Sequence, residues 1–311
     1  MFSSKIRSRS GRHIYRLNKI RSFTVVLIIF FAAVVTILLV SGLQKSVKNK
    51  SRELLRVWNA GDYEQTYEIS KEALNDKPVD YFLLTINGFS AYQWGISQIN
   101  NQNMIFYIDN CIRSLRKAVL LKNSSKDARV YYVLGKAYSY KGFEYSDLAV
   151  KYLEMADNLH YDAQDIPEYL GLAYAAAGDY RSSVEAFTKA FKTGSVSDNL
   201  LLSIARSYMA MGEYNMASGY LQRCIELSPD SKSIFTARLL LAEVCINSGD
   251  HNGAQAQYLK ILNETGENAE VRYQLGELFN LMGDTARARA EWRIAYRQDP
   301  AHAKARARLN I

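Results

Sequence analysis

Apolar residues recur along most of this chain at the spacing of a helix face, roughly every third or fourth position. No stretch shows the strict alternation of apolar and polar residues that is typical of a half-buried strand. A Gly followed by an acidic residue interrupts the helical pattern at intervals, and Pro follows several of the apolar stretches. The pattern predicts an all-α chain made of consecutive helix pairs.

The predicted helix pairs share a period. A small residue directly follows Leu or Ile at positions 171, 205, 242 and 276, which are 34, 37 and 34 residues apart. A Gly and an acidic residue follow each time and mark the turn of the pair: Gly178-Asp179, Gly212-Glu213, Gly249-Asp250 and Gly283-Asp284. This arrangement resembles the tetratricopeptide repeat (TPR), a helix–turn–helix unit of about 34 residues. The resemblance implies a right-handed α-solenoid, in which pairs stack because one pair cannot bury its apolar face alone.

Three less regular copies precede these four. Leu134-Gly135 belongs to a copy with two extra residues in its turn, KGFEYSD, and Trp58, Gly61 and Pro78 mark a first copy without the Leu-Gly pair. Between them, helices are expected over 81–94 and 106–121, joined by a connection about eleven residues longer than the repeat allows. We therefore expect about seven helix pairs over 44–302, best defined over 128–302, and the end of a capping helix over 303–311.

The residue types of the repeat have packing reasons. Ala or Gly stands where the two helices of a pair approach each other, and large apolar residues fill the adjoining places. The Gly of each turn tolerates a positive φ, and the neighbouring Asp can cap the next helix. Cys111, Cys224 and Cys245 fall at packing positions, so buried thiols are expected, with a disulfide between Cys224 and Cys245 as the alternative.

The N-terminus carries a different pattern. Residues 23–40 contain no charge, and a helix over 23–43 would be roughly 30 Å long, enough to cross a hydrocarbon core. This predicts a single transmembrane helix after a basic segment, 1–22, rather than a cleaved signal peptide, whose apolar run is usually shorter. Seven Lys or Arg precede the span and four follow it. This bias predicts an inner (cytoplasmic) membrane protein with a cytoplasmic N-terminus and periplasmic repeats.

Charge is unevenly distributed along the chain. The net charge of +8 comes from residues 1–52, which hold eleven Lys or Arg and no acidic residue. The remainder holds 28 basic and 31 acidic residues, a net of −3, and has no positive excess to attract phosphates. We therefore expect no nucleic-acid partner.

No catalytic or metal-binding constellation is recognisable in the sequence. The four histidines stand apart from one another, and none lies in a zinc motif. Gly135-Lys136 lacks the upstream glycine of a phosphate-binding loop, and the repeat explains it better, with Gly135 packed and Lys136 pointing outward. We expect no enzyme, cofactor, metal or small-molecule substrate, and an unrecognised enzyme is the distant alternative.

The resemblance also implies a groove that binds a protein or peptide partner. In the family, positions two, five, nine and twelve of each first helix face the partner. The candidate groove residues at these places are Phe82, Phe89, Tyr92, Arg129, Tyr132, Lys136, Glu168, Leu172, Leu202, Arg206, Met209, Leu239, Glu243, Tyr273, Glu277 and Asn280. The ninth positions Lys136, Leu172 and Arg206 do not reproduce the Lys and Asn set with which some members grip a C-terminal carboxylate. A different ligand is expected.

These features predict a membrane-anchored scaffold or adaptor that mediates protein–protein interactions in the assembly of a multi-protein envelope complex. Bacterial proteins of this design include translocon-associated chaperone-like factors and components of the periplasmic flagellar collar of spirochaetes. A secreted, soluble peptide-binding protein would follow instead if the segment 23–43 were part of a cleaved signal.

Overall fold

The chain divides into two compact units, Met1–Pro78 and Val79–Ile311. The computed structural model describes the first unit from residue 51 and the second except for residues 122–126 and 194–196. The basic segment 1–22 and the predicted membrane span 23–43 lie outside the described residues. Within the described ranges, no helix is long and apolar enough to cross a membrane.

The described part of the first unit is one helix–turn–helix. Residues 51–59 are helical, and α2 (Tyr63–Asp76) follows after a turn in which Gly61 has a φ of +76°. The side chain of Asp62 accepts a hydrogen bond from the backbone N–H of Gln65 at 3.0 Å. This bond satisfies one of the free N–H groups at the start of α2. The turn and the cap are those expected of the first repeat copy.

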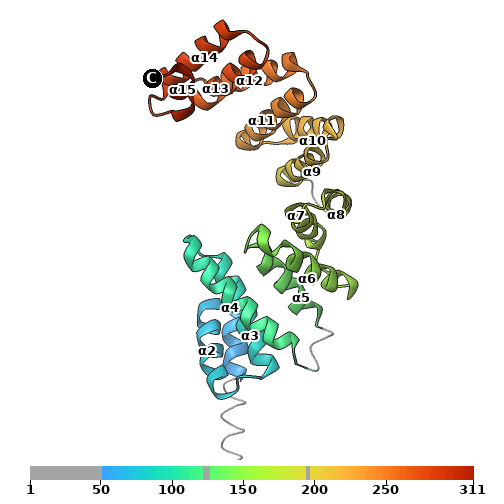
Figure 1. Ribbon diagram of the computed structural model, residues 1–311. Coiled ribbons are helices and arrows are strands. Elements are labelled where there is room, and N and C mark those ends of the chain that lie inside the picture. The colour runs from blue at the N-terminus through green and yellow to red at the C-terminus, as the bar shows by residue number, and fades with distance from the viewer. Residues whose placement is uncertain (1–50, 122–126, 194–196) are drawn as a thin grey trace, which may run out of the picture. The chain divides into compact units, whose positions relative to one another are not determined.

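The second unit consists of consecutive helix pairs, shown in Figure 1. In chain order its elements are α3 (Tyr81–Ile96), α4 (Asn101–Val119), α5 (Ala128–Ser139), the short 3-10 helix η2 (Phe143–Tyr145), α6 (Ser146–Asn158), α7 (Ile166–Ala176), α8 (Tyr180–Thr193), α9 (Asp198–Ala210), α10 (Tyr214–Leu227), α11 (Ser231–Asn247), α12 (His251–Thr265), α13 (Ala269–Leu281), α14 (Thr285–Gln298) and α15 (Ala303–Leu309). Each odd-numbered helix from α3 to α13 packs on the helix that follows it, and α15 packs on α14. Successive first helices also touch, as α5 does with α3 and α7.

The long connection expected after α3 is not present. Only residues 97–100 separate α3 from α4. The side chain of Asn100 accepts hydrogen bonds from the N–H groups of Gln102 and Asn103, which starts α4 at residue 101 rather than 106. The extra length is taken up by the helices, of 16 and 19 residues. In the KGFEYSD turn, by contrast, the extra residues do form an addition to the repeat, the 3-10 helix η2.

Small residues bring the helices of a pair close together. At Gly135 in α5, a Cβ atom would lie 2.5 Å from Cγ of Leu153 in α6. At Gly171 in α7, it would overlap the ring of Phe187 in α8. Leu153 and Phe187 are both fully buried. The close approach predicted for this place in the repeat is confirmed in both pairs.

The turns between paired helices also follow the prediction. Gly178 has a φ of +81°, which a side chain would disfavour, and Asp179 accepts a hydrogen bond from the N–H of Ser182 at 3.1 Å. Asp250 and Asp284 cap α12 and α14 in the same way. The turn residues therefore end one helix and begin the next.

The three cysteines are free thiols. Cys111 and Cys224 are buried, Cys245 is partly buried, and burial raises the pKa of each thiol. The packing role is confirmed. The alternative, a disulfide between Cys224 and Cys245, is wrong.

We expect Gly171→Ala to destabilise the chain by about 1–3 kcal/mol, because the added methyl group overpacks the contact with Phe187. Gly219→Ala is the matched control. Gly219 lies in α10, and a Cβ there would meet nothing within 4 Å, so this variant should gain about 0.5–1 kcal/mol. Urea denaturation, monitored by circular dichroism, measures the change in the free energy of unfolding for both variants. Equal shifts for the two variants would contradict the close approach.

Candidate functional site

A lysine surrounded by tyrosines links three successive first helices. Nζ of Lys136, on α5, lies 2.8 Å from Oδ2 of Asp165 at the start of α7 and 2.9 Å from the hydroxyl oxygen of Tyr132. It also lies over the rings of Tyr169, Tyr132 and Tyr92, at 4.3, 4.9 and 5.9 Å from their centroids. Only 13% of the lysine side chain is exposed. The prediction that Lys136 points outward is therefore wrong, because a carboxylate and three ring faces hold the ammonium inside.

Hydrogen bonding keeps the side chain of Lys136 protonated in this cluster. Burial by itself would lower the pKa of Lys136, but the bonds to Asp165 and Tyr132 outweigh burial and raise it. Tyr132 in turn donates to the Asp165 carboxylate, 2.7 and 2.9 Å from its two oxygens, and burial raises the pKa of this tyrosine to about 12. Burial also raises the pKa of Tyr169. At neutral pH the raised pKa values keep Lys136 an ammonium and keep Tyr92, Tyr132 and Tyr169 neutral phenols.

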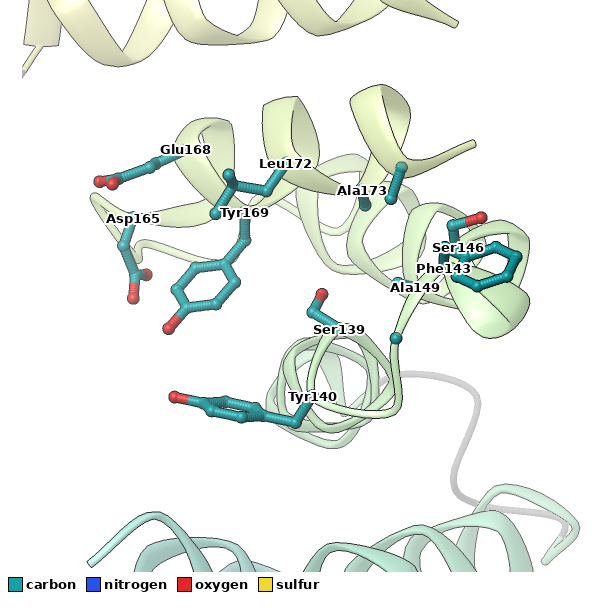
Figure 2. Close-up of a pocket in the computed structure, with 12 residues that line it drawn as sticks. Ser139, Tyr140, Phe143, Ser146, Ala149, Asp165, Glu168, Tyr169, Leu172 and Ala173 are labelled. Atoms are coloured by element: carbon teal, nitrogen blue, oxygen red, sulfur yellow. The ribbon is translucent and has the colours of Figure 1, made fainter. Parts of the chain in front are cut away.

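A cavity of about 650 Å³ opens beside the cluster, between α5 and α7. Figure 2 shows Ser139 of α5 pointing into it from one side, with Leu172 and Ala173 of α7 on the other. Tyr140 and Tyr169 stand at the end near the cluster, and the opposite end is formed by η2 and α6. The volume falls within the range of small-ligand and side-chain pockets.

The lining of the cavity combines exposed apolar surface with one unbalanced charge. Phe143 is 74% exposed and Leu172 is 42% exposed, although both are large apolar side chains. The lining has two acidic residues, Asp165 and Glu168, and no basic one. Lys136 neutralises Asp165, whereas Glu168 has no ion pair or hydrogen bond within the described part of the chain. One end of the cavity is therefore apolar and the other carries a free carboxylate.

The repeats and the site can now be compared with known proteins. A family model described as a tetratricopeptide repeat-like domain matches residues 144–311, more than half of the chain. The chain belongs to this tetratricopeptide repeat family. Its members bind protein and peptide partners and are typically scaffolds rather than enzymes.

Two solved structures have a similar fold. The C-terminal part of a TPR repeat-containing protein from Cytophaga hutchinsonii matches with a TM-score of 0.61 and 16% identity, over 84% of this chain and 99% of that one. PilW, described as a widely conserved type IV pilus biogenesis factor, matches with a TM-score of 0.54 and 17% identity, over 71% of this chain and 98% of that one. At these identities the likeness concerns the fold alone.

One curated relative is also similar. Tetratricopeptide repeat protein 8 of Caenorhabditis elegans is 24% identical over 138 residues, which are 44% of this chain and 27% of the relative. The TPR chain thus matches about a quarter of that protein's length.

The structure brings together five of the predicted groove residues. Tyr92, Tyr132 and Lys136 belong to the tyrosine cluster, while Glu168 and Leu172 line the cavity. Tyr92 is only 4% exposed, so its role in the free chain is packing.

The other predicted groove residues of the TPR chain fall into two groups. Those on the surface are Phe82, Arg129, Arg206, Glu243 and Asn280. Arg129 is engaged with the N-cap of its own helix, since its guanidinium lies 2.9 Å from Asp127.

Packing engages the second group. Leu202 is 6% exposed, and the partly buried side chains are Phe89, Met209, Leu239, Tyr273 and Glu277. Two of them meet the last helix, α15, or its N-cap. The ring of Tyr273 is tilted against that of the N-cap His302, with centroids 5.3 Å apart, and Glu277 accepts a hydrogen bond from Nε of Arg308 at 2.9 Å.

Four important residues were absent from the predicted set. Asp165 occupies the second position of its copy, so the register rule that named Glu168 would have found it. Tyr140 and Tyr169 stand at other positions of the first helices, and Phe143 lies in the extended turn. No periodic rule points to these three. In the described ranges, no group of three or more His, Cys, Asp or Glu residues is placed to hold a metal ion.

The ion pair should contribute measurable coupling. We expect Lys136→Gln and Asp165→Asn each to destabilise the chain, and a double-mutant cycle to give a coupling free energy of about 1–3 kcal/mol, because the lysine is largely desolvated. Urea denaturation of the four proteins measures it. The control cycle uses Lys71 and Glu68, an exposed pair in α2, for which about 0.2–0.5 kcal/mol is expected. Equal coupling in the two cycles would contradict the special role of the buried pair.

Proposed function

We propose that this chain is a membrane-anchored scaffold that holds a partner protein on its first helices during assembly of an envelope complex. Membership of the TPR family supports the binding role. The apolar segment 23–43 supports the anchor, and the excess of basic residues before it supports periplasmic repeats. The partner would be a protein or peptide rather than a nucleic acid or a small substrate.

The cavity between α5 and α7 is the observation that carries the binding role. Packing within a solenoid buries apolar side chains between neighbouring helices. Here Leu172 and Phe143 remain exposed around a hollow that already holds an unpaired carboxylate. Exposed apolar surface gathered around a cavity is typical of a recognition site. A partner segment lying across the first helices would cover it.

The envelope role is the more specific part of the proposal. PilW, which shares the fold, is described as a pilus biogenesis factor, and an anchored TPR chain is suited to the same kind of task. A spirochaete flagellar collar and a translocon-associated chaperone-like complex are the other settings we consider. The alternative is a secreted, soluble peptide-binding protein released by cleavage after residue 42.

We expect the native protein to keep residues 23–43 and to stay in the membrane pellet after a carbonate wash, because a span of this length is not extracted by breaking ionic contacts. Intact-mass measurement of the purified protein checks the first point and fractionation the second. A mature N-terminus at Leu43 would overturn the anchor and favour the secreted alternative.

Charge reversal on the first helices should weaken partner binding. We expect Arg206→Glu combined with Glu243→Lys to lower the yield of cross-linked partner in native membranes at least five-fold, since both side chains are exposed at groove positions. Cross-linking followed by mass spectrometry gives the yield. Glu226→Lys combined with Lys260→Glu, on the second helices α10 and α12, is the control with matched charge changes. Unchanged cross-links in the groove variant would refute the proposed binding face.

A further inference from the structure

We propose that the cavity between α5 and α7 binds a partner segment carrying a large apolar side chain and, close to it in sequence, a lysine or arginine. The inference rests on the proposed function and adds the chemistry of the partner. The apolar side chain enters the hollow beneath Leu172, and the basic side chain pairs with Glu168.

The apolar half of the site comes from a departure from the repeat. The extended turn after α5 places Phe143, in the added helix η2, at one end of the cavity. Gly142, which also lines the cavity, keeps the place and the positive φ of the usual turn glycine. Ala149, Ala173 and Ala176 are the small side chains that leave the space open. Phe143 and Leu172 both gain a partner if a large apolar side chain enters between them. The cavity of about 650 Å³ has room for such a side chain together with its backbone.

The charge of the cavity lining determines which type of residue lies near the apolar residue in the sequence of the partner segment. Two carboxylates and no cation belong to the lining, and Lys136 compensates only Asp165. An acidic partner segment would bring a second negative charge close to Glu168, and the lining has no basic side chain that could pair with it. A basic segment would pair with Glu168 and could also lie against Tyr140 or Tyr169. Lys136 already shows that this environment holds an ammonium, since it lies 4.3 Å from the Tyr169 ring centroid.

The two halves lie at opposite ends of the same hollow. In Figure 2, Phe143 stands at one end, and Glu168 stands at the other, beyond Tyr169. A bound segment is thereby oriented, with its apolar side chain toward η2 and its basic side chain toward the start of α7. The basic groups on neighbouring elements do not cancel the carboxylate: Arg129 is paired with Asp127, and Arg206, exposed on α9, is outside the lining.

The experiment is a selection of random 12-residue peptides displayed on phage against the full-length chain and three variants. Glu168→Lys reverses the free charge, and Ala176→Trp fills the cavity from an exposed position. Glu226→Lys makes the same charge change as the first variant at an exposed position on the second helix α10, outside the proposed binding face, and serves as its control. Dissociation constants of the selected peptides are then measured by fluorescence anisotropy, and circular dichroism confirms that each variant is folded.

We expect the wild-type chain and Glu226→Lys to enrich peptides in which an aromatic residue or leucine lies within three residues of lysine or arginine. Binding of these peptides should fall at least ten-fold with Glu168→Lys and with Ala176→Trp. Selection on Glu168→Lys should replace the basic residue of the motif by Asp or Glu.

Three results would overturn the inference: no enrichment, enrichment of acidic or uncharged motifs, or binding that is insensitive to Glu168→Lys. The proposed function is judged separately by the cross-linking of the Arg206 and Glu243 variant. If that cross-link depends on the groove while the peptides ignore Glu168, the scaffold function stands and the proposed partner chemistry fails.

Discussion

The second unit depends on how closely the two helices of each pair approach. A small residue on the first helix leaves room for a large side chain on the second, as Gly135 does for Leu153 and Gly171 for Phe187. Each such contact buries one large apolar side chain but leaves the outer faces of the pair apolar, and the next pair must cover them. The repeat period follows from this constraint, because every copy has to present the same small and large residues to its neighbours.

The candidate site arises where the chain departs from that rule. The extended turn after α5 adds η2 and places an exposed aromatic ring beside the cavity. In the same region, Lys136 is held under tyrosine rings and paired with Asp165 across a gap of 29 residues. The pair joins α5 to α7 and leaves Glu168 as the uncompensated charge of the lining. In the proposed site, Asp165 thus serves stability through its pairing with Lys136, while Glu168 is left for recognition.

Groove positions at the C-terminal end of the second unit are used differently from those in its middle. Near α13, Tyr273 and Glu277 are engaged by His302 and Arg308 of α15, so the last helix covers surface that corresponds to open groove elsewhere. Between α5 and α9, by contrast, Leu172 and Arg206 remain exposed. Within the described chain, α15 therefore takes up part of the groove surface at the C-terminal end, whereas exposed groove residues remain on earlier first helices.

The sequence by itself determined the helical class, the period, the turns and the caps, because each depends on residues a few positions apart along one helix or turn. It also named Tyr132, Lys136, Glu168 and Leu172 as candidate site residues through the register. Only the tertiary structure decided that Lys136 points inward and that a cavity lies between α5 and α7. Periodicity reports which face of a helix is buried. The partner of a charge and the space between two helices depend on distances across the fold, which no local pattern contains.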